Sequence, residues 1–291
     1  MKNIVPRVAA IHDISGFGRC SLTVIIPVLS AMGIQVCPLP TAILSTHPGG
    51  FGPFYFHDFT DSMEEYAAHW KDIGLEFDCV YSCFLASERQ IDIVMDFFQT
   101  FVTGKVQLIV VDPVMGDHEV LYKTYNSEMQ RRMRLLVEKA DAITPNLTEA
   151  CFLLDIPYKD EPMDAEKARS LLWRLSCFGP QNVVVTGVVG EDGRHMNIGY
   201  EAGRDLYWKI TYDRVPSQYP GTGDIFTGVL VGGLLQRDSF PLAVDRAAQF
   251  VSLAIGITYG YGTPEKEGVL LEKVLNHLGG LPGRMNYEVL E

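Results

Sequence analysis

The sequence has no long apolar run and no low-complexity stretch. No segment approaches the roughly 18 consecutive apolar residues of a transmembrane helix, so we expect no membrane span. The opening residues, MKNIVPRVAAIHDISGFG, turn polar too early for a secretory signal. Apolar residues make up 47% of the 291 residues and charged residues 21%, as in ordinary globular proteins. These features exclude extended disorder and predict a soluble protein without a membrane partner.

Basic residues are also scarce. Lys and Arg together number 24 against 36 Asp and Glu, which gives a formal net charge of −12. A surface of this sign repels nucleic acids and anionic membranes, so we expect neither as the main partner. A phosphorylated small molecule is still compatible with it, because a few backbone N–H groups and one metal ion can bind phosphate locally.

The six cysteines lack the spacing of a metal site. Cys79 and Cys83 are four positions apart, with no second pair and no histidine cluster nearby, so we expect no zinc site. The other cysteines are scattered, several of them inside apolar segments. This pattern is typical of buried free thiols in a reducing compartment, and it predicts a cytoplasmic protein.

Short apolar segments alternate with amphipathic ones along the chain. Strands are expected at 8–12, 35–37 (ended by Pro38), 79–82, 106–111, 142–144 and 182–186, with antiparallel strands in 195–213. Helices are expected at 21–32, 61–73, 88–101, 127–139, 147–154, 165–177, 223–235, 243–259 and 265–278. This repetition predicts an α/β fold of three layers, with a mostly parallel central sheet and helices on both faces. Because no linker or repeat interrupts it, residues 1–291 are expected to form one domain.

Ligands of such folds bind at the carboxyl ends of the parallel strands, so the residues after each strand matter most. The first strand is followed by Asp13-Ile-Ser-Gly16-Phe-Gly18, but the third glycine of a dinucleotide-binding motif is absent. No acidic residue ends the second strand, and GxxxxGK[ST] occurs nowhere in the chain. Both observations argue against a dinucleotide-binding oxidoreductase and a P-loop enzyme.

Two carboxylates follow the buried strand at 106–111. That strand leads into Asp112-Pro-Val-Met-Gly-Asp117, a turn shaped by proline and glycine. Carboxylates directly beyond a buried strand suit coordination of Mg²⁺ or of Mg²⁺-bound phosphate. The same residues could instead accept hydrogen bonds from turn N–H groups or cap a helix, so this segment alone leaves the two interpretations level.

Two further strand ends carry weaker signals. The segment Thr144-Pro-Asn146-Leu-Thr-Glu149 has Asn at a helix start and Glu three residues later, which is typical of a capping box that needs no ligand. Residues 182–186 are expected to lead into a turn of small residues at 187–190. Adenine or phosphate could lie against such a turn, but an ordinary strand exit is the stronger interpretation of that segment alone.

The most informative segment is Gly221-Thr222-Gly223-Asp224, which opens a very apolar helix. Glycines there let a ligand approach the backbone, where unpaired N–H groups and the positive end of the helix dipole attract anions. Such a site suits a phosphoryl group in transfer, with Asp224 placed to take a proton from the attacking hydroxyl. Asp224 could instead only favour the helix dipole, but two glycines destabilise a helix start unless something must come close.

Taken in order, the segments DPVMGD, ITPNLTE, VVVTG and GTGD resemble the ribokinase superfamily, over residues 8–260 or so. Within it the chain is similar to the pyridoxal kinases, which phosphorylate vitamin B6 vitamers. Ser45-Thr-His47-Pro-Gly-Gly-Phe51 resembles their substrate loop, and Cys83-Phe84-Leu-Ala-Ser87 resembles their glycine-tyrosine segment.

The resemblance implies a role for each matching residue. Asp224 would be the general base, beside an anion hole made of Gly221, Thr222 and Gly223. Mg²⁺ and phosphate would be handled by Asp112, Asp117, Asn146 and Glu149. ATP would lie along Thr144, Thr186, Gly187 and Arg214. The substrate ring would face Asp13, Ser45, His47 and Phe84. The resemblance also implies ATP and Mg²⁺ as cofactors, a homodimer, and a monovalent cation such as K⁺ near the anion hole.

Three residues depart from the pyridoxal kinase pattern. Asp13 stands where Ser is more frequent and is reminiscent of hydroxymethylpyrimidine kinases, Pro48 replaces a common Thr, and Phe84 replaces the usual Tyr. The expected activity is ATP-dependent phosphorylation of the 5′-hydroxymethyl group of pyridoxal, pyridoxine or pyridoxamine, with residues 46–59 as a lid against water. A hydroxymethylpyrimidine (phosphate) kinase of thiamine synthesis is the first alternative. A nucleotide- or vitamer-binding sensor without turnover is the second.

Overall fold

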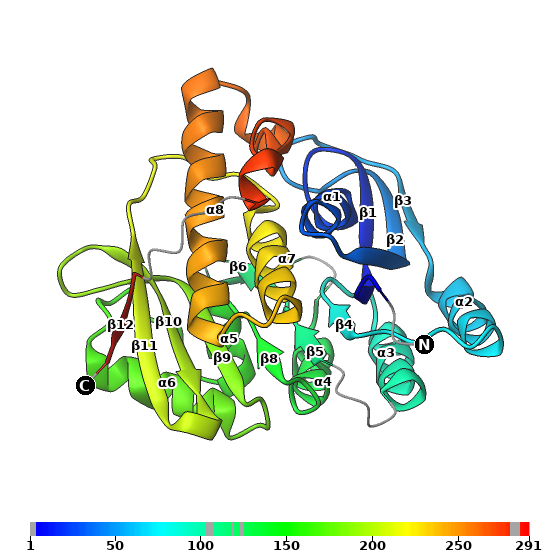
Figure 1. The fold of residues 1–291 in the computed structure, drawn as a ribbon, viewed down its shortest axis with the longest axis horizontal. Helices are drawn as coiled ribbons and strands as arrows, with labels where there is room; N and C mark the ends of the chain where they lie inside the picture. Colours follow the sequence, from blue (N-terminus) through cyan, green and yellow to red (C-terminus); the bar gives the residue numbers. More distant parts are fainter. Residues whose placement is uncertain (1–3, 103–107, 118, 123–124, 280–285, 291) are drawn as a thin grey trace.

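A ten-stranded sheet forms the centre of the structure (Figure 1). The computed structural model describes residues 4–102, 108–117, 119–122, 125–279 and 286–290. Within them the strand order is β12-β11-β10-β9-β8-β5-β4-β1-β2-β3. The strands are β1 (Arg7–Phe17), β2 (Gln35–Thr46), β3 (Phe56–Asp58), β4 (Cys79–Ser82), β5 (Leu108–Val111), β8 (Ala142–Ile143), β9 (Asn182–Val189), β10 (His195–Glu201), β11 (Leu206–Tyr212) and β12 (Tyr287–Val289).

The middle of this sheet is parallel. β2, β1, β4, β5, β8 and β9 pair in parallel, whereas β3 at one edge and β10 to β12 at the other pair antiparallel. A separate two-stranded ladder joins β6 (Gly116–Asp117) to β7 (Val120–Leu121). The predicted α/β class and the antiparallel strands at 195–213 are therefore confirmed. The organisation as one domain stays a prediction, as does the start of the strand expected at 106–111, because residues 106 and 107 lie outside the described part of the chain.

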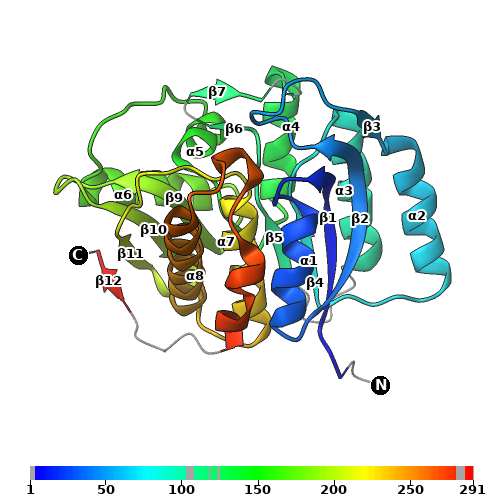
Figure 2. The same cartoon turned by 90° about the horizontal axis from the view of Figure 1, so that it is seen from above.

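Helices cover both faces of the sheet, so the structure has the three predicted layers (Figure 2). One face carries α1 (Leu22–Ala31), α7 (Thr222–Leu235) and α8 (Phe240–Tyr261). The other carries α2 (Thr60–Asp72), α3 (Glu88–Phe101), α4 (Ser127–Val137), α5 (Leu147–Leu154) and α6 (Ala165–Ser176). Successive strand side chains point to opposite faces, so in β1 Ala9 and Ile11 join one core while Val8 and Ala10 join the other. Burial on both faces explains the continuous apolar strands of the sequence.

The first two strands are longer than predicted. β1 runs to Phe17 rather than ending at His12, so the glycine-containing segment expected as a loop is mostly strand, with a register shift between His12 and Ile14. The prediction that Pro38 ends the second strand is wrong, because β2 continues past it to residue 46. β3 pairs with β2 at residues 42–44, so Pro38 lies near an edge, where a missing N–H is tolerated.

The prediction of a last helix at 265–278 is also wrong. Three short 3₁₀ helices replace it: η2 (Glu265–Glu267), η3 (Leu271–Lys273) and η4 (Leu275–Gly279). The chain turns at Gly268, which packs so closely on the backbone after β1 that a Cβ would lie 2.7 Å from the Arg19 carbonyl oxygen. Arg19 N also donates to the Glu267 carbonyl at 3.0 Å. A contact with a residue far away in sequence therefore interrupts the helical pattern.

α8 is long and apolar enough, by length and composition alone, to cross a membrane. Its 18-residue window has a mean hydropathy of 1.3, and half of that window is buried inside the structure. The helix packs along α7 and also contains Asp245 and Arg246. Core helices that are buried on most sides meet the same criterion, so this is weak support for a membrane span. The absence of a membrane partner stays a prediction.

We predict that Gly199→Ala destabilises the fold. Gly199 of β10 lies opposite the fully buried Trp208 of β11, and a Cβ there would come within 2.1 Å of the indole ring. Overpacking of this kind should lower the free energy of unfolding by about 1–3 kcal/mol, measured by urea denaturation. Gly203→Ala is the matched control, because a Cβ at Gly203 meets no atom within 4 Å. Equal losses in the two variants would contradict the prediction.

Candidate active site

Polar side chains gather where the parallel strands end and α7 begins. His12 lies in β1, and Cys83 and Asp112 directly follow β4 and β5. Thr144 follows β8, and Asp224 lies in the first turn of α7. Neighbouring parallel strands end at the same edge of a sheet, so residues that are far apart in the sequence meet here. Two hydrogen-bonded networks result.

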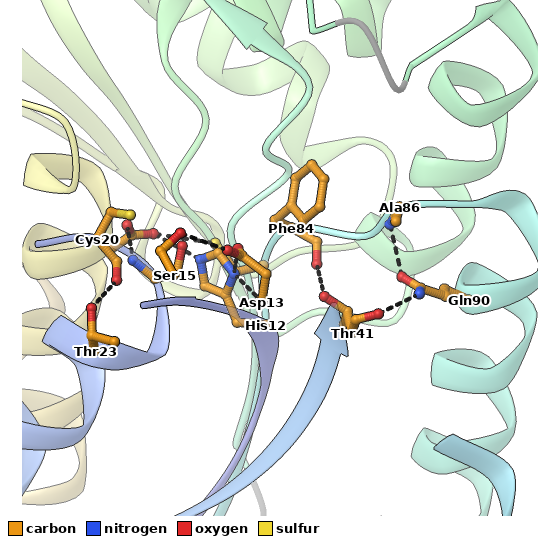
Figure 3. A network of polar contacts seen from close by, with 12 residues as sticks. His12, Asp13, Ser15, Cys20, Thr23, Thr41, Phe84, Ala86 and Gln90 are labelled. Carbon is orange, nitrogen blue, oxygen red and sulfur yellow. Dashed lines mark hydrogen bonds and ion pairs between the residues drawn. The ribbon is translucent and has the colours of Figure 1, made fainter. Parts of the chain in front are cut away.

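The first network is centred on His12, which is 3% exposed. Its Nε2 lies 2.9 Å from Asp224 Oδ1, and its Nδ1 lies 2.8 Å from Asp13 Oδ1. The second oxygen of Asp224 accepts a hydrogen bond of 2.6 Å from the backbone N–H of Ser21. Figure 3 shows His12, Asp13 and Ser15 together in the second half of β1, where Ser15 Oγ donates to Asp13 Oδ2 at 3.3 Å.

The charges in this network favour a protonated imidazole. Burial acts to lower the pKa of His12, but the acidic groups of Cys83, Asp224 and Asp13 around it raise it well above its usual value. Burial acts to raise the pKa of Asp13, and the charge and hydrogen bond of His12 hold it below its usual value. A positive charge on His12 would stabilise the two carboxylates beside it.

The second network surrounds Asp112, which is 5% exposed. Thr227 of α7 donates from Oγ1 to Asp112 Oδ2 at 3.2 Å, and the same Oγ1 lies 3.0 Å from Thr144 Oγ1. Burial, and after it the negative charge of Asp224, raise the pKa of Asp112 to about 7. A carboxylate in such surroundings gains from a bound cation.

Glu149 and Asn146 form the capping box expected from the sequence. Asn146 accepts from Glu149 N at 2.8 Å, while Glu149 Oε2 accepts from Asn146 N at 2.9 Å. Glu149 Oε1 accepts from Met115 N at 3.1 Å, so the box also holds the turn after β5. Burial, and next the charge of Asp112, raise the pKa of Glu149 well above its usual value. With Asp117, exposed in β6, these carboxylates are the oxygen ligands that would suit Mg²⁺.

The two glycines before Asp224 have different explanations. Gly221 has a φ of +80°, and a Cβ there would lie 2.1 Å from the Arg19 carbonyl oxygen, so packing of the chain itself requires glycine. A Cβ at Gly223 meets nothing within 4 Å, so the surface there is open. Thr222 Oγ1 donates to the Tyr219 carbonyl at 3.0 Å. Packing of the protein therefore explains the glycine at 221, and approach of a ligand is needed at most to explain the glycine at 223.

The predicted substrate residues His47, Ser45 and Phe84 form hydrogen bonds to other groups of the protein itself. The His47 ring donates from Nε2 to the Lys266 carbonyl at 2.6 Å and accepts at Nδ1 from Gly49 N at 3.0 Å, so both nitrogens are engaged. Ser45 Oγ accepts from the backbone N–H of Tyr55 at 2.9 Å, next to β3. Phe84 is half-buried, and its carbonyl accepts from Thr41 at 3.1 Å (Figure 3).

The predicted ATP residues lie along β9 and beyond β11. Thr186 forms a parallel bridge with Asn146, which connects this region to the capping box. The prediction of a turn after 182–186 is wrong, because β9 continues to residue 189 through Gly187. Gly187 has a φ of +73° beside a register shift against β10, so it marks a bulge that sequence periodicity cannot distinguish from a turn. Arg214 is exposed, with Nη1 3.5 Å from His195 Nε2.

The sequence prediction missed His12, Cys83 and Thr227. His12 could have been suspected as a polar residue at the end of an apolar strand, directly before Asp13. Cys83 lies in a segment noted for Phe84, and Thr227 lies one helical turn after Asp224. Cys83 is 1% exposed, its Sγ lies 3.7 Å from Asp224 Oδ1, and burial raises the pKa of its thiol well above the usual value.

Known proteins similar to this chain are described as phosphomethylpyrimidine kinases or as pyridoxal kinases. The family model described as phosphomethylpyrimidine kinase matches residues 59–268. A solved structure from Bacteroides thetaiotaomicron, described as a candidate phosphomethylpyrimidine kinase, is 47% identical, with a TM-score of 0.95 over 99% of each chain. A second crystal form of it, described as containing pyridoxal, has a TM-score of 0.93 and covers 98% of this chain and 99% of that chain.

Two further matches are described as pyridoxal kinases. The solved structure from Lactobacillus plantarum is 29% identical, with a TM-score of 0.86, and covers 95% of this chain and 97% of that chain. A relative from Schizosaccharomyces pombe, described as a candidate pyridoxal kinase, is 26% identical over 210 residues. That match covers 68% of this chain but 58% of the relative, less than two thirds of its length. The ribokinase-like fold expected from the sequence is confirmed.

We predict that Asp112→Asn makes the protein more stable above pH 7 when no metal or nucleotide is present. A carboxyl whose folded pKa is raised from 3.8 to about 7 favours folding while it is protonated, and this stability is lost as pH rises from about 4 to 7. Each pKa unit corresponds to about 1.4 kcal/mol, so the effect should reach a few kcal/mol. Urea denaturation from pH 4 to 8 measures it.

The difference between Asp112→Asn and the unaltered protein should grow across that pH range and then level off. Asp72→Asn, on the exposed face of α2, is the matched control and should show no such trend. A constant difference at every pH would show that Asp112 ionises normally.

Proposed function

Because the chain belongs to the phosphomethylpyrimidine kinase family of the ribokinase superfamily, we propose that it transfers the γ-phosphoryl group of ATP to a hydroxymethyl group on a heteroaromatic ring. We propose that this ring is a B6 vitamer (pyridoxal, pyridoxine or pyridoxamine) and that the product is its 5′-phosphate. The observation that carries the proposal is the position of Asp224 in the first turn of α7, between His12 and Ser21 N. The relative described as containing pyridoxal supports the choice of substrate.

In this proposal Asp224 is the general base. Among the described residues, Ser21 N is the donor to Asp224 Oδ2, which leaves a lone pair to receive the substrate proton. The deprotonated oxygen attacks the γ-phosphorus in line, the bond to the bridging oxygen breaks, and ADP leaves with that electron pair. The N–H groups at residues 222–224 face the charge that spreads over the equatorial oxygens.

The acidic groups near Asp224 would serve the nucleotide. Asp112, Glu149 and Asp117 offer carboxylate oxygens for Mg²⁺, which when bound neutralises charge on the transferring phosphates. Thr186 and Arg214 would contact ATP at the β9 side of the site. A K⁺ ion, a homodimer and a cytoplasmic location stay predictions.

Hydroxymethylpyrimidine or its phosphate is the alternative substrate, supported by the family description and by Asp13. In the structure, Asp13 is 5% exposed and its two oxygens face His12 and Ser15. A carboxylate occupied in this way contributes to the base network, so its presence is weaker support for a pyrimidine than the sequence suggested. The substrate preference is decided by experiment.

We predict that, with ATP and Mg²⁺, mass spectrometry detects a phosphate added to pyridoxal, pyridoxine or pyridoxamine and none added to ribose. Hydroxymethylpyrimidine and its phosphate are tested in parallel. If only the pyrimidines are phosphorylated, the protein is a hydroxymethylpyrimidine (phosphate) kinase rather than a B6 vitamer kinase. Bound ATP without product from any substrate would favour the sensor without turnover.

We predict that Asp224→Asn lowers kcat for the phosphorylated substrate by ~10²–10⁴-fold, the usual contribution of a positioned general base. ATP binding, measured by calorimetry, should change little because the amide keeps the shape of the side chain. Asp72→Asn is the control and should keep full activity. A kcat for Asp224→Asn within a few-fold of the unaltered enzyme would exclude Asp224 as the base.

A further inference from the structure

His12, Cys83 and Asp224 bring three kinds of ligand atom together from three parts of the fold. His12 Nε2 and Asp224 Oδ1 are 2.9 Å apart, and Cys83 Sγ lies 3.7 Å from the same oxygen. All three atoms lie within 4.8 Å of one another, and in the described part of the chain no other His, Cys, Asp or Glu group of three does so. The spacing of Cys79 and Cys83 argues against a zinc site built on paired cysteines, whereas this group contains a single cysteine.

The separations of these atoms are close to those around a tetrahedral metal. Zinc binds nitrogen, sulfur and oxygen ligands at about 2.0–2.3 Å, which places neighbouring ligand atoms about 3.3–3.7 Å apart. The observed distances of 2.9 and 3.7 Å lie near that range, so shifts of less than about 1 Å would complete the geometry. Replacing the proton between His12 and Asp224 by a cation requires no rearrangement of the sheet.

Neighbouring groups already orient two of the ligands. Asp13 holds His12 Nδ1 through two groups, because its Oδ1 lies 2.8 Å away and its backbone N donates to the same nitrogen at 2.8 Å. These contacts direct Nε2 toward Asp224, and a carboxylate next to the far nitrogen is typical of metal-binding histidines. Ser21 N holds Asp224 Oδ2 and leaves Oδ1 facing the site. The Asp224 side chain is 13% exposed, whereas that of His12 is 4% exposed, so the open side of the site is at Asp224.

We propose that His12 Nε2, Cys83 Sγ and Asp224 Oδ1 form a site for Zn²⁺ and similar soft divalent cations, and that a cation bound there inhibits the enzyme. Imidazole and thiolate select Zn²⁺ or Co²⁺, whereas Mg²⁺ prefers oxygen ligands, so the Mg²⁺ used with ATP would not compete. The inhibition rests on the proposed function, because it assumes that Asp224 is the base; binding of the cation does not.

The chemistry of binding balances without any further reactant. The thiol proton of Cys83 and the Nε2 proton of His12 pass to solvent as the cation takes their places. Asp224 Oδ1 exchanges its hydrogen bond for a bond to the metal. The charge of the metal lowers the basicity of the whole carboxylate, so Oδ2 no longer takes the proton of a substrate hydroxyl. The fourth coordination position faces the open side, where water or the substrate hydroxyl binds.

Co²⁺ is the probe, because a cobalt–thiolate bond gives a charge-transfer band in the near ultraviolet. We expect one equivalent of Co²⁺ to produce this band in the unaltered full-length protein and one equivalent of Zn²⁺ to remove it. Cys83→Ser should lose the band. Cys177→Ser, at the exposed end of α6, is the matched control and should keep it. Asp13→Asn should weaken Co²⁺ binding by about tenfold or more.

A second measurement follows phosphorylation at fixed ATP and Mg²⁺. Zn²⁺ at the concentration that displaces Co²⁺ should inhibit the unaltered enzyme and Cys177→Ser, with each rate compared with its own rate in chelator. Cys83→Ser should be far less sensitive. Thermal unfolding confirms that each variant is folded, and His12→Gln replaces Cys83→Ser if the latter is not.

Each outcome bears on the proposal. The absence of a band in the unaltered protein overturns the proposed site. A band that is retained in Cys83→Ser also overturns it, because Co²⁺ then binds adventitiously at another place. Phosphorylation without a band overturns the metal site and leaves the proposed function standing. A band without phosphorylation of any substrate supports the site and rejects the proposed function, so the two failures are distinguishable.

Discussion

The site depends on Asp224, because this one carboxylate joins the start of α7 to the end of β1. Its oxygens accept hydrogen bonds from His12 and Ser21 N, which are 212 and 203 residues away in the chain. Gly221 and Gly268 pack against the backbone of Arg19 from two further directions, so the segment after β1 is held on several sides. The position of the proposed base and the packing of α7 against the segment after β1 therefore depend on neighbouring contacts. A change in that segment would disturb the proposed base as well as the packing of the last third of the chain.

Negative charge is concentrated at this edge of the sheet. Asp13, Asp112, Glu149 and Asp224 lie near one another, with His12 between Asp13 and Asp224. Burial, and after it their mutual repulsion, raise the pKa of Asp112 and Glu149, and a bound cation would relieve both effects. This arrangement explains how a protein with a net charge of −12 could handle an anionic nucleotide, since it would bind the nucleotide as a metal complex rather than as a bare anion. The same concentration of acidic and soft ligand atoms underlies the proposed binding of Zn²⁺.

The sequence pattern predicted most of the helices and strands, because most of them are determined by the periodicity and capping residues of their own segment. α3 and α5 have the predicted boundaries, and a Ser or Asn cap with its hydrogen bond begins each of them. The errors fall where contacts from elsewhere overrule the local pattern. Pro38 lies inside a strand because of its place near the sheet edge, Gly187 lies in a bulge rather than a turn, and Gly268 interrupts a helical pattern to pack on Arg19. None of these contacts can be predicted from the pattern of the ten or fifteen residues around it.

The sequence by itself determined the α/β class, the capping box at Asn146, and the position of Asp224 at the start of an apolar helix, because each depends on spacing within one segment. The tertiary structure alone decided that His12 and Cys83 join Asp224 and that Gly221 is required by packing on Arg19. It also decided that both ring nitrogens of His47 are engaged, one by Gly49 of its own loop and the other by the distant Lys266 carbonyl. Such contacts join residues that share no local pattern. They exist only because parallel strands, whatever their order in the chain, end at one edge of the sheet.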